Sequence, residues 1–382
     1  MIMKIAFIGQ KGIPASGGGV ERYVEDLAVR LAAAGHEVTV YTRSHYTPKA
    51  LTEYRGVRLV NLPTIHTKHL DTIIHSTLSC WHAIMTGVEV AHFQTIGPAL
   101  VCWLPKLLRP QMKIVSTLQS LDYEHQKWGS FAKLMLKLGE RLMCKFSDEV
   151  IVVTKTMEQY AKDKYGITTR HIPNGANLAE PVGDDLLAPW GLAKDNYFVA
   201  ISRLVRHKGL HYLIAAYQKL TTDKKLVIVG DGAFTDSYVS ELKALAAGDE
   251  RIIFTGNQTG EVLAQLYANA YLFVQPSESE GLSLALLEAM ARGTAVLVSD
   301  IDANREAVGD AGFMFINKDT AYLRHQLQAL VSQPEKVKAM ARAGQTRVAQ
   351  NFNWDKITLD MIKAYQEAGQ RAPAMAEVGH TV

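Results

Sequence analysis

Two glutamates, Glu280 and Glu288, stand eight residues apart in the segment "SESEGLSLALLEAMARG" (277–293). Glu280 precedes a glycine and is expected on a loop, whereas Glu288 lies in an apolar run that predicts a buried helix. A carboxylate in such a helix needs a partner, because an unpaired buried charge is very costly. Two interpretations stay open: both acids bond to protein backbone, or they flank a polar ligand at the helix N-terminus.

Basic residues follow another predicted strand, "YFVAIS" (197–202). The next segment, "RLVRHKG", supplies Arg203, Arg206 and Lys208. A guanidinium fork and a compact ammonium suit a diphosphate. An exposed basic loop is the alternative, but the position at a strand's carboxyl end favours binding.

Backbone amides could add to an anion site at two places. Gly17, Gly18 and Gly19 precede a predicted helix, and glycines let an anion approach the N–H groups at a helix start. This glycine pattern is neither G-x-G-x-x-G nor the Walker motif, so it does not directly indicate a dinucleotide or a nucleoside triphosphate; a tight turn is the alternative. The second place is the helix start after "SESEG", where the N–H groups of Leu282, Ser283 and Leu284 are expected to point at an anion.

Short β-rich runs that alternate with helical patterns must position these residues. In the first half the predicted strands are 4–9, 37–42, 57–62, 88–93, 113–118 and 148–153, and in the second half 197–202, 225–230, 251–256, 270–276 and 294–300. Such alternation predicts parallel sheets covered on both faces. We therefore expect an α/β protein of two Rossmann-like, doubly wound domains that face a central cleft, with ligands at the carboxyl ends of the strands.

A stretch rich in Pro, Gly and Asp separates the two halves. We predict a first domain over 1–173, a linker over 174–190 and a second domain over 191–351. The last residues, 371–382, are expected to form a flexible tail.

Composition excludes several protein classes. The chain has 382 residues with 48% hydrophobic and 21% charged residues, which is typical of globular proteins and long enough for two domains. A net charge of +3 does not indicate nucleic-acid binding. Three cysteines without a Cys-x-x-Cys pair indicate a reducing compartment. With neither a secretory signal nor a long apolar segment, we expect a cytoplasmic protein.

Taken together, the motifs resemble the retaining glycosyltransferases of family 4 (glycosyl transferases group 1), which have the GT-B fold. The most specific element is Glu280-x7-Glu288. In the family's order, the chain also contains "GGVERYVEDLAVRLAAAGHEVTV", "SRLVRHKGLHYLI", "VIVGDG" and "IIFTGN". The resemblance covers residues 3 to 369.

This resemblance implies a metal-independent transfer of a sugar from a nucleotide diphosphate donor to a glycan or lipid-linked acceptor, with no cofactor. Arg203 and Lys208 would bind the diphosphate, where charge develops as the sugar leaves. Glu280 would contact the donor sugar and Glu288 the ribose hydroxyls. The other donor-binding residues implied are Gly18, Gly19, Gly232, Asn257, Leu282, Ser283 and Leu284. The segment 352–370 resembles the terminal helix that crosses back to the first domain.

One position departs from the family pattern. The family commonly has a histidine after the strand that corresponds to 113–118, whereas this chain has Gln119. A glutamine donates and accepts hydrogen bonds but does not titrate. Gln119, Asp122 and His125 are the candidates for the acceptor or sugar side.

Other signals are weaker. Asp300 and Asp302 form a D-x-D pair, but a metal site would need more acids, and the histidines between His66 and His82 fit no zinc spacing. The segment 127–146 is basic and amphipathic, which suits either an anionic membrane surface or a helix packed on its own sheet. A nucleotide-sugar epimerase and a non-catalytic sugar-nucleotide-binding protein are the alternative functions.

Overall fold

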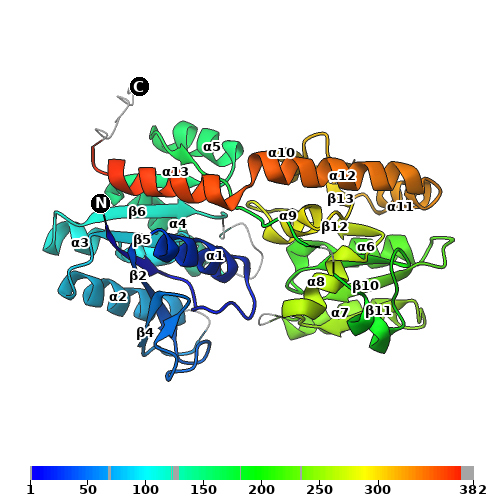
Figure 1. The fold of residues 1–382 in the computed structure, drawn as a ribbon, viewed down its shortest axis with the longest axis horizontal. Helices are drawn as coiled ribbons and strands as arrows, with labels where there is room; N and C mark the ends of the chain where they lie inside the picture. Colours follow the sequence, from blue (N-terminus) through cyan, green and yellow to red (C-terminus); the bar gives the residue numbers. More distant parts are fainter. Residues whose placement is uncertain are drawn as a thin grey trace. The chain divides into compact units, whose positions relative to one another are not determined.

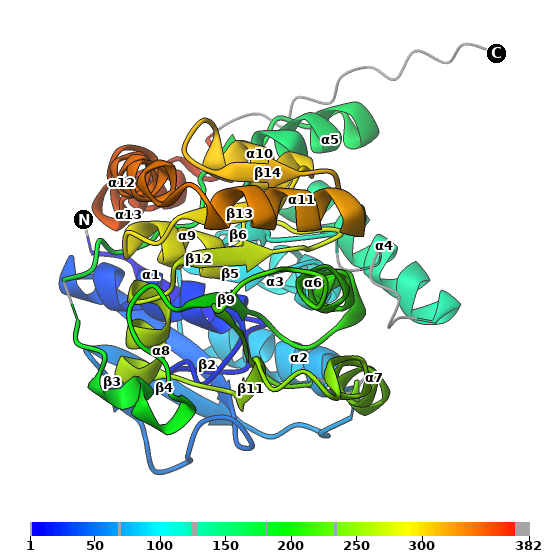
Figure 2. The same cartoon turned by 90° about the vertical axis from the view of Figure 1, so that its right-hand side faces the viewer.

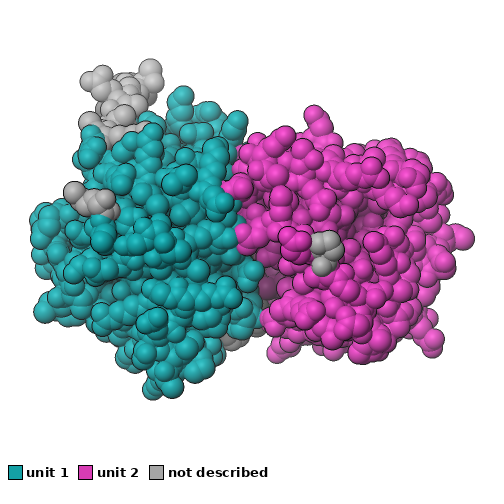
Figure 3. Space-filling view, viewed as in Figure 1, with its two compact units in different colours: residues 1–174, 354–382 teal, residues 175–353 magenta. Residues whose placement is uncertain are grey.

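The computed structural model describes residues 2–67, 70–121, 123, 129–180, 182–232 and 235–370. The chain divides into two compact units (Figure 3). Unit 1 contains residues 1–174 and 354–382, and unit 2 contains residues 175–353. The chain therefore leaves unit 1, builds unit 2 and returns to unit 1 with its last helix.

Unit 1 is built on an eight-stranded sheet in the order β3-β4-β2-β1-β5-β6-β7-β8. All neighbours are parallel except β3 and β4. The strands are β1 (Lys4–Ile8), β2 (Glu37–Arg43), β3 (Glu53–Tyr54), β4 (Val57–Leu62), β5 (Val90–Gln94), β6 (Lys113–Leu118), β7 (Glu149–Val152) and β8 (Arg170–His171).

Helices cover this sheet on both faces. On one face α1 packs against α13, which is drawn in red in Figure 1. On the other, α3 lies between α2 and α4. The helices of unit 1 are α1 (Gly19–Ala33), α2 (Leu70–Met85), α3 (Trp103–Leu108), α4 (Ser130–Phe146), α5 (Lys155–Tyr165) and α13 (Trp354–Glu367), with a 3-10 helix η1 (Pro98–Val101).

Unit 2 contains a six-stranded parallel sheet in the order β11-β10-β9-β12-β13-β14. Its strands are β9 (Tyr197–Ile201), β10 (Lys225–Val229), β11 (Ile252–Gly256), β12 (Leu272–Gln275), β13 (Val296–Ser299) and β14 (Phe313–Phe315). Its helices are η3 (Asp185–Trp190), η4 (Arg206–Lys208), α6 (Leu210–Tyr217), α7 (Asp236–Ala246), α8 (Gly260–Ala268), α9 (Leu284–Ala291), α10 (Asp302–Val308), α11 (Thr320–Val331) and α12 (Pro334–Asn351).

Most residues in the strands of unit 2 are apolar, because helices cover both faces of the sheet. The helix α6 packs against both α7 and α11 (Figure 2), and α9 packs against α8 and α12. Leu226 and Ile228 of β10 are completely buried in one core with residues of α6, α7 and α11. Continuous burial of this kind is characteristic of parallel sheets.

The predicted mixed α/β class with two Rossmann-like sheets is confirmed. Each predicted strand corresponds to an observed one, whereas three short strands, β3, β8 and β14, were not predicted. These have only two or three residues, too few to show a periodic pattern.

Part of the segment predicted as a linker is structured. Residues 185–190 form η3, which packs on α8 within unit 2. Gln265 of α8 is completely buried; its Oε1 accepts from the N–H of Leu186 at 2.9 Å, and its Nε2 donates to Asp185 at 2.8 Å. These hydrogen bonds come from Gln265, which is distant in the sequence, so the residues of the segment itself did not predict the helix.

Among the described residues, no helix is both long and apolar enough to cross a membrane.

Candidate active site

The strand order of unit 2 creates a switch point between β9 and β12. The strand that follows β9 in the chain, β10, pairs with one edge of β9, and β12 pairs with the opposite edge of β9. The loops after β9 and β12 therefore leave the sheet edge side by side and turn in opposite directions. Ligands of open α/β sheets bind outside the carboxyl ends of the strands at such a point. Both the "RLVRHKG" loop and the "SESEG" loop begin there.

Backbone contacts fix these two loops to each other. The N–H of Glu278 donates to the carbonyl oxygen of His207 at 2.7 Å. Gly209 has a φ of +68°, and a Cβ at this position would collide with the carbonyl oxygen of Pro276. Glycine is therefore needed at position 209 both for its backbone conformation and for the close approach of the loops.

Lys208 and Glu280 meet across the same junction. Lys208 Nζ lies 2.6 Å from Glu280 Oε1, and the two side chains are only 15% and 9% exposed. Both ends of this ion pair are thus largely withdrawn from water. The structure brings together two residues that the sequence placed on different motifs.

The two arginines of the first loop differ in their surroundings. Arg203 directly follows β9 and is exposed. Arg206 forms an ion pair with Glu241, and its guanidinium lies 4.9 Å from the centre of the Tyr238 ring. Arg206 is therefore engaged by α7, which leaves Arg203 as the better placed of the two arginines.

The start of α9 differs from the expectation in one respect. Leu282 and Ser283 precede the helix, which begins at Leu284. Ser283 is its N-cap: the hydroxyl accepts from the N–H of Leu286 at 3.3 Å and donates to Gln275 at 2.7 Å. One of the helix's free N-terminal amides is thus satisfied by protein. The predicted anion contact at this helix start can use at most the remaining amides.

Glu288 lies one turn further along α9. Leu284, Leu287 and Ala291 are buried as predicted, whereas Glu288 is half-buried and remains accessible. The predicted buried helix is therefore observed, and the Glu288 side chain is half-buried on it.

A third acid of the "SESEG" segment, Glu278, was not singled out from the sequence. Its carboxylate accepts from the Tyr212 hydroxyl at 3.1 Å and pairs with Lys318 Nζ at 3.0 Å. Burial raises the pKa of Tyr212, and the hydrogen bond to Glu278 and its charge act in the same direction. Glu278 thus anchors the loop that carries Glu280. Its place two residues before Glu280 was the only signal in the sequence.

Two further predicted donor-binding residues lie at the ends of neighbouring strands. Gly232 follows β10, and its N–H donates to Asp231 Oδ1 at 2.8 Å. Asn257 follows β11 and is exposed. Both lie at the carboxyl edge of the sheet, on the β10–β11 side of the switch point.

The glycine-rich loop of unit 1 follows β1 and leads into α1. Gly18 is the N-cap of α1 with a φ of +97°, and Gly19 is the first helical residue. The carboxylate of Glu21 folds back on this turn: its Oε1 accepts from the N–H of Lys11 at 3.0 Å. A negative charge at a helix N-terminus is stabilised by the helix dipole, so this end of α1 already carries one carboxylate.

Gln119 directly follows β6 and is 8% exposed. Its Nε2 is buried and has no hydrogen-bond partner among the described residues. Asp122 and His125, the other two residues predicted on the acceptor or sugar side, lie outside the described residues.

Asp300 and Asp302 do not form a shared pair of ligands. Asp300 Oδ2 pairs with Arg305 at 2.9 Å, and its Oδ1 accepts from the N–H of Asn317 at 2.8 Å. Asp302 is exposed at the start of α10. Both carboxylate oxygens of Asp300 are engaged by protein groups, so Asp300 and Asp302 are poorly suited to bind a cation together.

Within the described part of the chain, one group has the composition of a metal site: His45, His66 and Asp71. Asp71 Oδ2 is already held by Arg43 Nη1 at 2.6 Å, and the two imidazoles are stacked with centroids 3.9 Å apart. Burial lowers the pKa of His45; the charge of Asp71 opposes this shift, and the charges of His66, Arg43 and Lys11 add to it. The surrounding positive charge disfavours a cation there.

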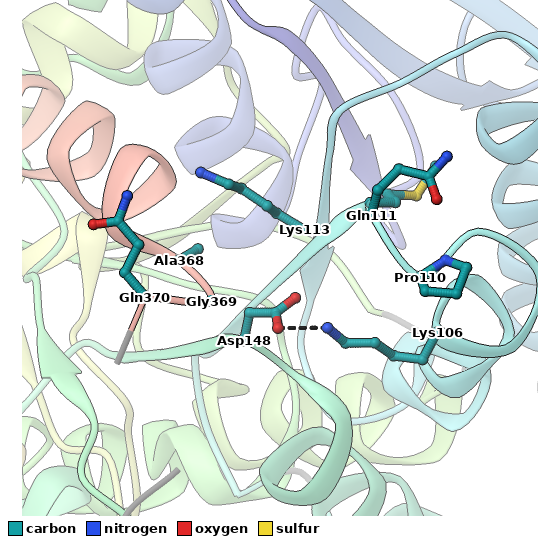
Figure 4. Close-up of a pocket in the computed structure, with 9 residues that line it drawn as sticks. Lys106, Pro110, Gln111, Lys113, Asp148, Ala368, Gly369 and Gln370 are labelled. Carbon is teal, nitrogen blue, oxygen red and sulfur yellow. Dashed lines mark hydrogen bonds and ion pairs between the residues drawn. The ribbon is translucent and has the colours of Figure 1, made fainter. Parts of the chain in front are cut away.

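Figure 4 shows a cavity of about 350 Å³ in unit 1. Lys113, the first residue of β6, lines it together with the paired side chains of Lys106 and Asp148. The cavity therefore lies at the amino end of β6, whereas Gln119 follows its carboxyl end. None of the candidate site residues lines it.

Known protein families match both units. Residues 17–180 match the family described as Glycosyltransferase Family 4, and residues 186–347 match Glycosyl transferases group 1. Glycogen synthase of Mycobacterium tuberculosis is 28% identical, with 97% of each chain covered.

Solved structures agree with this family assignment. Sucrose-phosphate synthase from Thermosynechococcus elongatus is 26% identical with a TM-score of 0.82, and the match covers 96% of this chain and 98% of the other. HepE from Anabaena, solved in complex with UDP-glucose, is 21% identical with a TM-score of 0.81, over 96% of this chain and 100% of the other. The chain belongs to the GT-B glycosyltransferases, with a Family 4 segment in unit 1 and a group 1 segment in unit 2.

Proposed function

We propose that the protein is a retaining, metal-independent glycosyltransferase that moves a sugar from a nucleotide diphosphate sugar to a glycan or lipid-linked acceptor. The observation that carries this proposal is the ion pair between Lys208 and Glu280 at the switch point of unit 2. It places one cation and one carboxylate within 2.6 Å at the sheet edge where a nucleotide sugar of this fold family would lie.

In the proposed reaction, Arg203 and Lys208 stabilise the negative charge that builds on the diphosphate as its bond to the sugar C1 breaks. The acceptor oxygen attacks C1 from the same face. Its proton passes to the departing phosphate oxygen, so the products are the glycosylated acceptor and a protonated nucleoside diphosphate. No step needs a titrating side chain at position 119, where Gln119 offers only hydrogen bonds.

The carboxylates take different parts in this scheme. Glu280 faces the sugar, where positive charge appears in the transition state, and the ion pair with Lys208 holds that carboxylate in position. Glu288, which is accessible on α9, holds the ribose hydroxyls. The cations do the work that a divalent metal does in other transferases, which supports metal independence.

A panel of nucleotide sugars tests the proposal. UDP-glucose is the first donor to try, because HepE of the same fold was solved with it. We expect slow release of the nucleoside diphosphate from one donor without acceptor, and a sugar product that keeps its anomeric configuration. Donor binding without release would support the non-catalytic alternative. A change of configuration at C2 would support the epimerase. Binding of no donor at all would overturn the proposal.

We also propose that unit 1 docks on an anionic membrane surface through α4. Phe131, Leu134 and Leu138 of this helix are 75%, 62% and 40% exposed, so this apolar stripe is not packed on the sheet. Lys137, Arg141 and Lys145 are exposed on the same helix. Exposed apolar and basic side chains on one helix suit insertion among anionic headgroups. A lipid-linked acceptor would fit this placement.

A further inference from the structure

The glycine-rich loop of unit 1 is held by a tyrosine from a different element. Tyr46 follows β2 closely, and its hydroxyl reaches the loop backbone. The hydroxyl accepts from the N–H groups of Ser16 at 2.9 Å and Gly17 at 3.2 Å, and it donates to the carbonyl oxygen of Gly17 at 2.9 Å. A hydroxyl has one hydrogen to donate and two lone pairs, so these bonds use its whole capacity.

The segment that carries Tyr46 is itself tied to the same loop. Thr47 Oγ1 donates to the carbonyl oxygen of Ile13 at 3.1 Å. The N–H of Arg43 donates to the carbonyl oxygen of Lys11 at 2.8 Å. A tyrosine hydroxyl is protonated and able to donate at neutral pH, and burial raises the pKa of Tyr46 further. Tyr46 is therefore a fixed support and not a mobile surface side chain.

Gly18 is held by Arg22, whose N–H donates to the Gly18 carbonyl oxygen at 3.2 Å, and by the Glu21 carboxylate that lies against it, whereas the glycine before it has fewer contacts. Gly17, Gly18 and Gly19 follow one another, and consecutive glycines have the greatest backbone freedom. A Cβ on Gly17 would meet no atom within 4 Å, and Gly18 has a φ of +97°. On the N-terminal side, the N–H of Ala15 is fixed by Glu25 at 2.6 Å. The three bonds from Tyr46 join this fixed end to the start of α1.

We propose that Tyr46 is a positioning residue for sugar transfer: it turns the amides of Ser16 and Gly17 inward, so that the backbone of Gly18 and Gly19 is presented to the anionic part of the nucleotide sugar. This inference rests on the proposed function. A loop ordered before the substrate arrives loses less entropy when it binds, and donors already in place stabilise developing charge without reorganisation. A free triple-glycine loop would have to be ordered in every turnover.

Tyr46→Phe tests this idea because it removes the hydroxyl and keeps the ring. The matched control is Tyr41→Phe on β2, since the Tyr41 hydroxyl bonds to His82 Nδ1 at 2.9 Å and not to the loop or to Glu25. Hydrogen exchange is measured on short peptides that cover Ser16 and Gly17, without substrate. Initial rates give kcat and KM for the donor identified in the panel.

For Tyr46→Phe we expect faster exchange at Ser16 and Gly17 and a kcat/KM about tenfold lower, the size expected from losing one to two net hydrogen bonds. Tyr41→Phe should change neither quantity. Unchanged exchange in Tyr46→Phe would overturn the proposal, and so would faster exchange with an unchanged kcat/KM. If the unmodified protein transfers no sugar, the proposed function fails, and the exchange measurement alone still decides whether Tyr46 holds the loop.

Discussion

Lys208 Nζ and Glu280 Oε1 lie 2.6 Å apart, and each side chain is the charge partner of the other at the switch point of unit 2. The partner that Glu280 needs is thus a protein side chain contributed by the loop after β9. Removing one member of a pair so withdrawn from water leaves an uncompensated charge, which costs more than the pair contributes. The residues must therefore be tested together.

Replacing Lys208 by Met should lower both stability and turnover. We expect a loss of up to about 3 kcal/mol in the free energy of unfolding, because Glu280 loses its partner, and a fall in kcat of about two to four decades from the lost charge partner of the diphosphate. The double variant Lys208→Met/Glu280→Gln should recover much of the stability but none of the turnover. Chemical unfolding and initial rates on the three variants measure both effects.

Two controls accompany this cycle. Arg203→Ala should lower turnover without loss of stability, because Arg203 is exposed. Lys243→Ala, an exposed lysine on α7, should change neither. Normal turnover in both Lys208→Met and Arg203→Ala would remove these cations from the site.

Substitution of the two glutamates of the site, Glu280 and Glu288, should affect different kinetic constants. Glu288 is proposed to bind the ribose in both the ground state and the transition state, so Glu288→Gln should chiefly raise the donor KM. Glu280 faces charge that appears only as the bond breaks, so Glu280→Gln should chiefly lower kcat. Steady-state kinetics and melting temperatures of both variants check this. Lower melting temperatures with unchanged kinetics would mean that both acids are structural.

Transfer should not depend on a divalent metal. The proposed site uses Arg203 and Lys208 as its cations, and Asp300 is held by Arg305 and Asn317. We expect the same initial rate after dialysis against EDTA as before it. Loss of activity that Mg²⁺ or Mn²⁺ restores would contradict this and would direct attention to Asp300 and Asp302.

Acid should destabilise unit 1 through His92. This side chain is completely buried on β5, bonded to Tyr365 of α13 at 2.8 Å and to Thr117 at 2.7 Å, and burial lowers its pKa to about 3. The unfolded state takes up a proton below a pKa of about 6.5, whereas the folded state does not. Stability is therefore full above pH 7 and falls as the pH drops from 6.5 towards 3, with a loss of about 2 kcal/mol at pH 5 from His92 alone.

Urea unfolding of the protein between pH 4.5 and 8 measures this dependence. His75, whose pKa burial lowers to about 4, contributes in the same direction. In His92→Gln, the free energy of unfolding should therefore still fall with decreasing pH, but less steeply than in the unmodified protein. A stability that stays constant between pH 7 and 5 would show that His92 is not held neutral by burial.

Membrane docking through α4 predicts a specific loss of vesicle binding. Changing Lys137, Arg141 and Lys145 to Glu should release the protein from vesicles that contain phosphatidylserine, since each basic residue near such a surface contributes about 1 kcal/mol. Co-sedimentation at low salt measures it. The same reversal of charge at Lys336, Lys338 and Arg342, which are exposed on α12 of unit 2, is the matched control. If the unmodified protein does not sediment with these vesicles, the proposal fails.

Much of the fold could be predicted from the sequence, because short β-rich runs alternate with helical patterns along the chain. The runs at 57–62 and 113–118 coincide with β4 and β6, and Gly209 and Lys208 already belonged to a motif. Local backbone chemistry also shows in the sequence: Gly18, at a φ of +97°, stands in a conformation that glycine tolerates best.

Pairings between distant segments depended on the tertiary structure. Glu280 and Lys208 are 72 residues apart, and only the strand order that sets β12 beside β9 makes them partners. Tyr46 meets Gly17 because β2 pairs with β1, and Gln265 structures residues 185–190 from 79 positions away. Sequence periodicity reports which face of an element is buried, but it does not report what lies opposite. The sequence by itself thus showed which residues could do chemistry and on which loops they lie. The order of the strands in the sheets decided which of these residues are in contact.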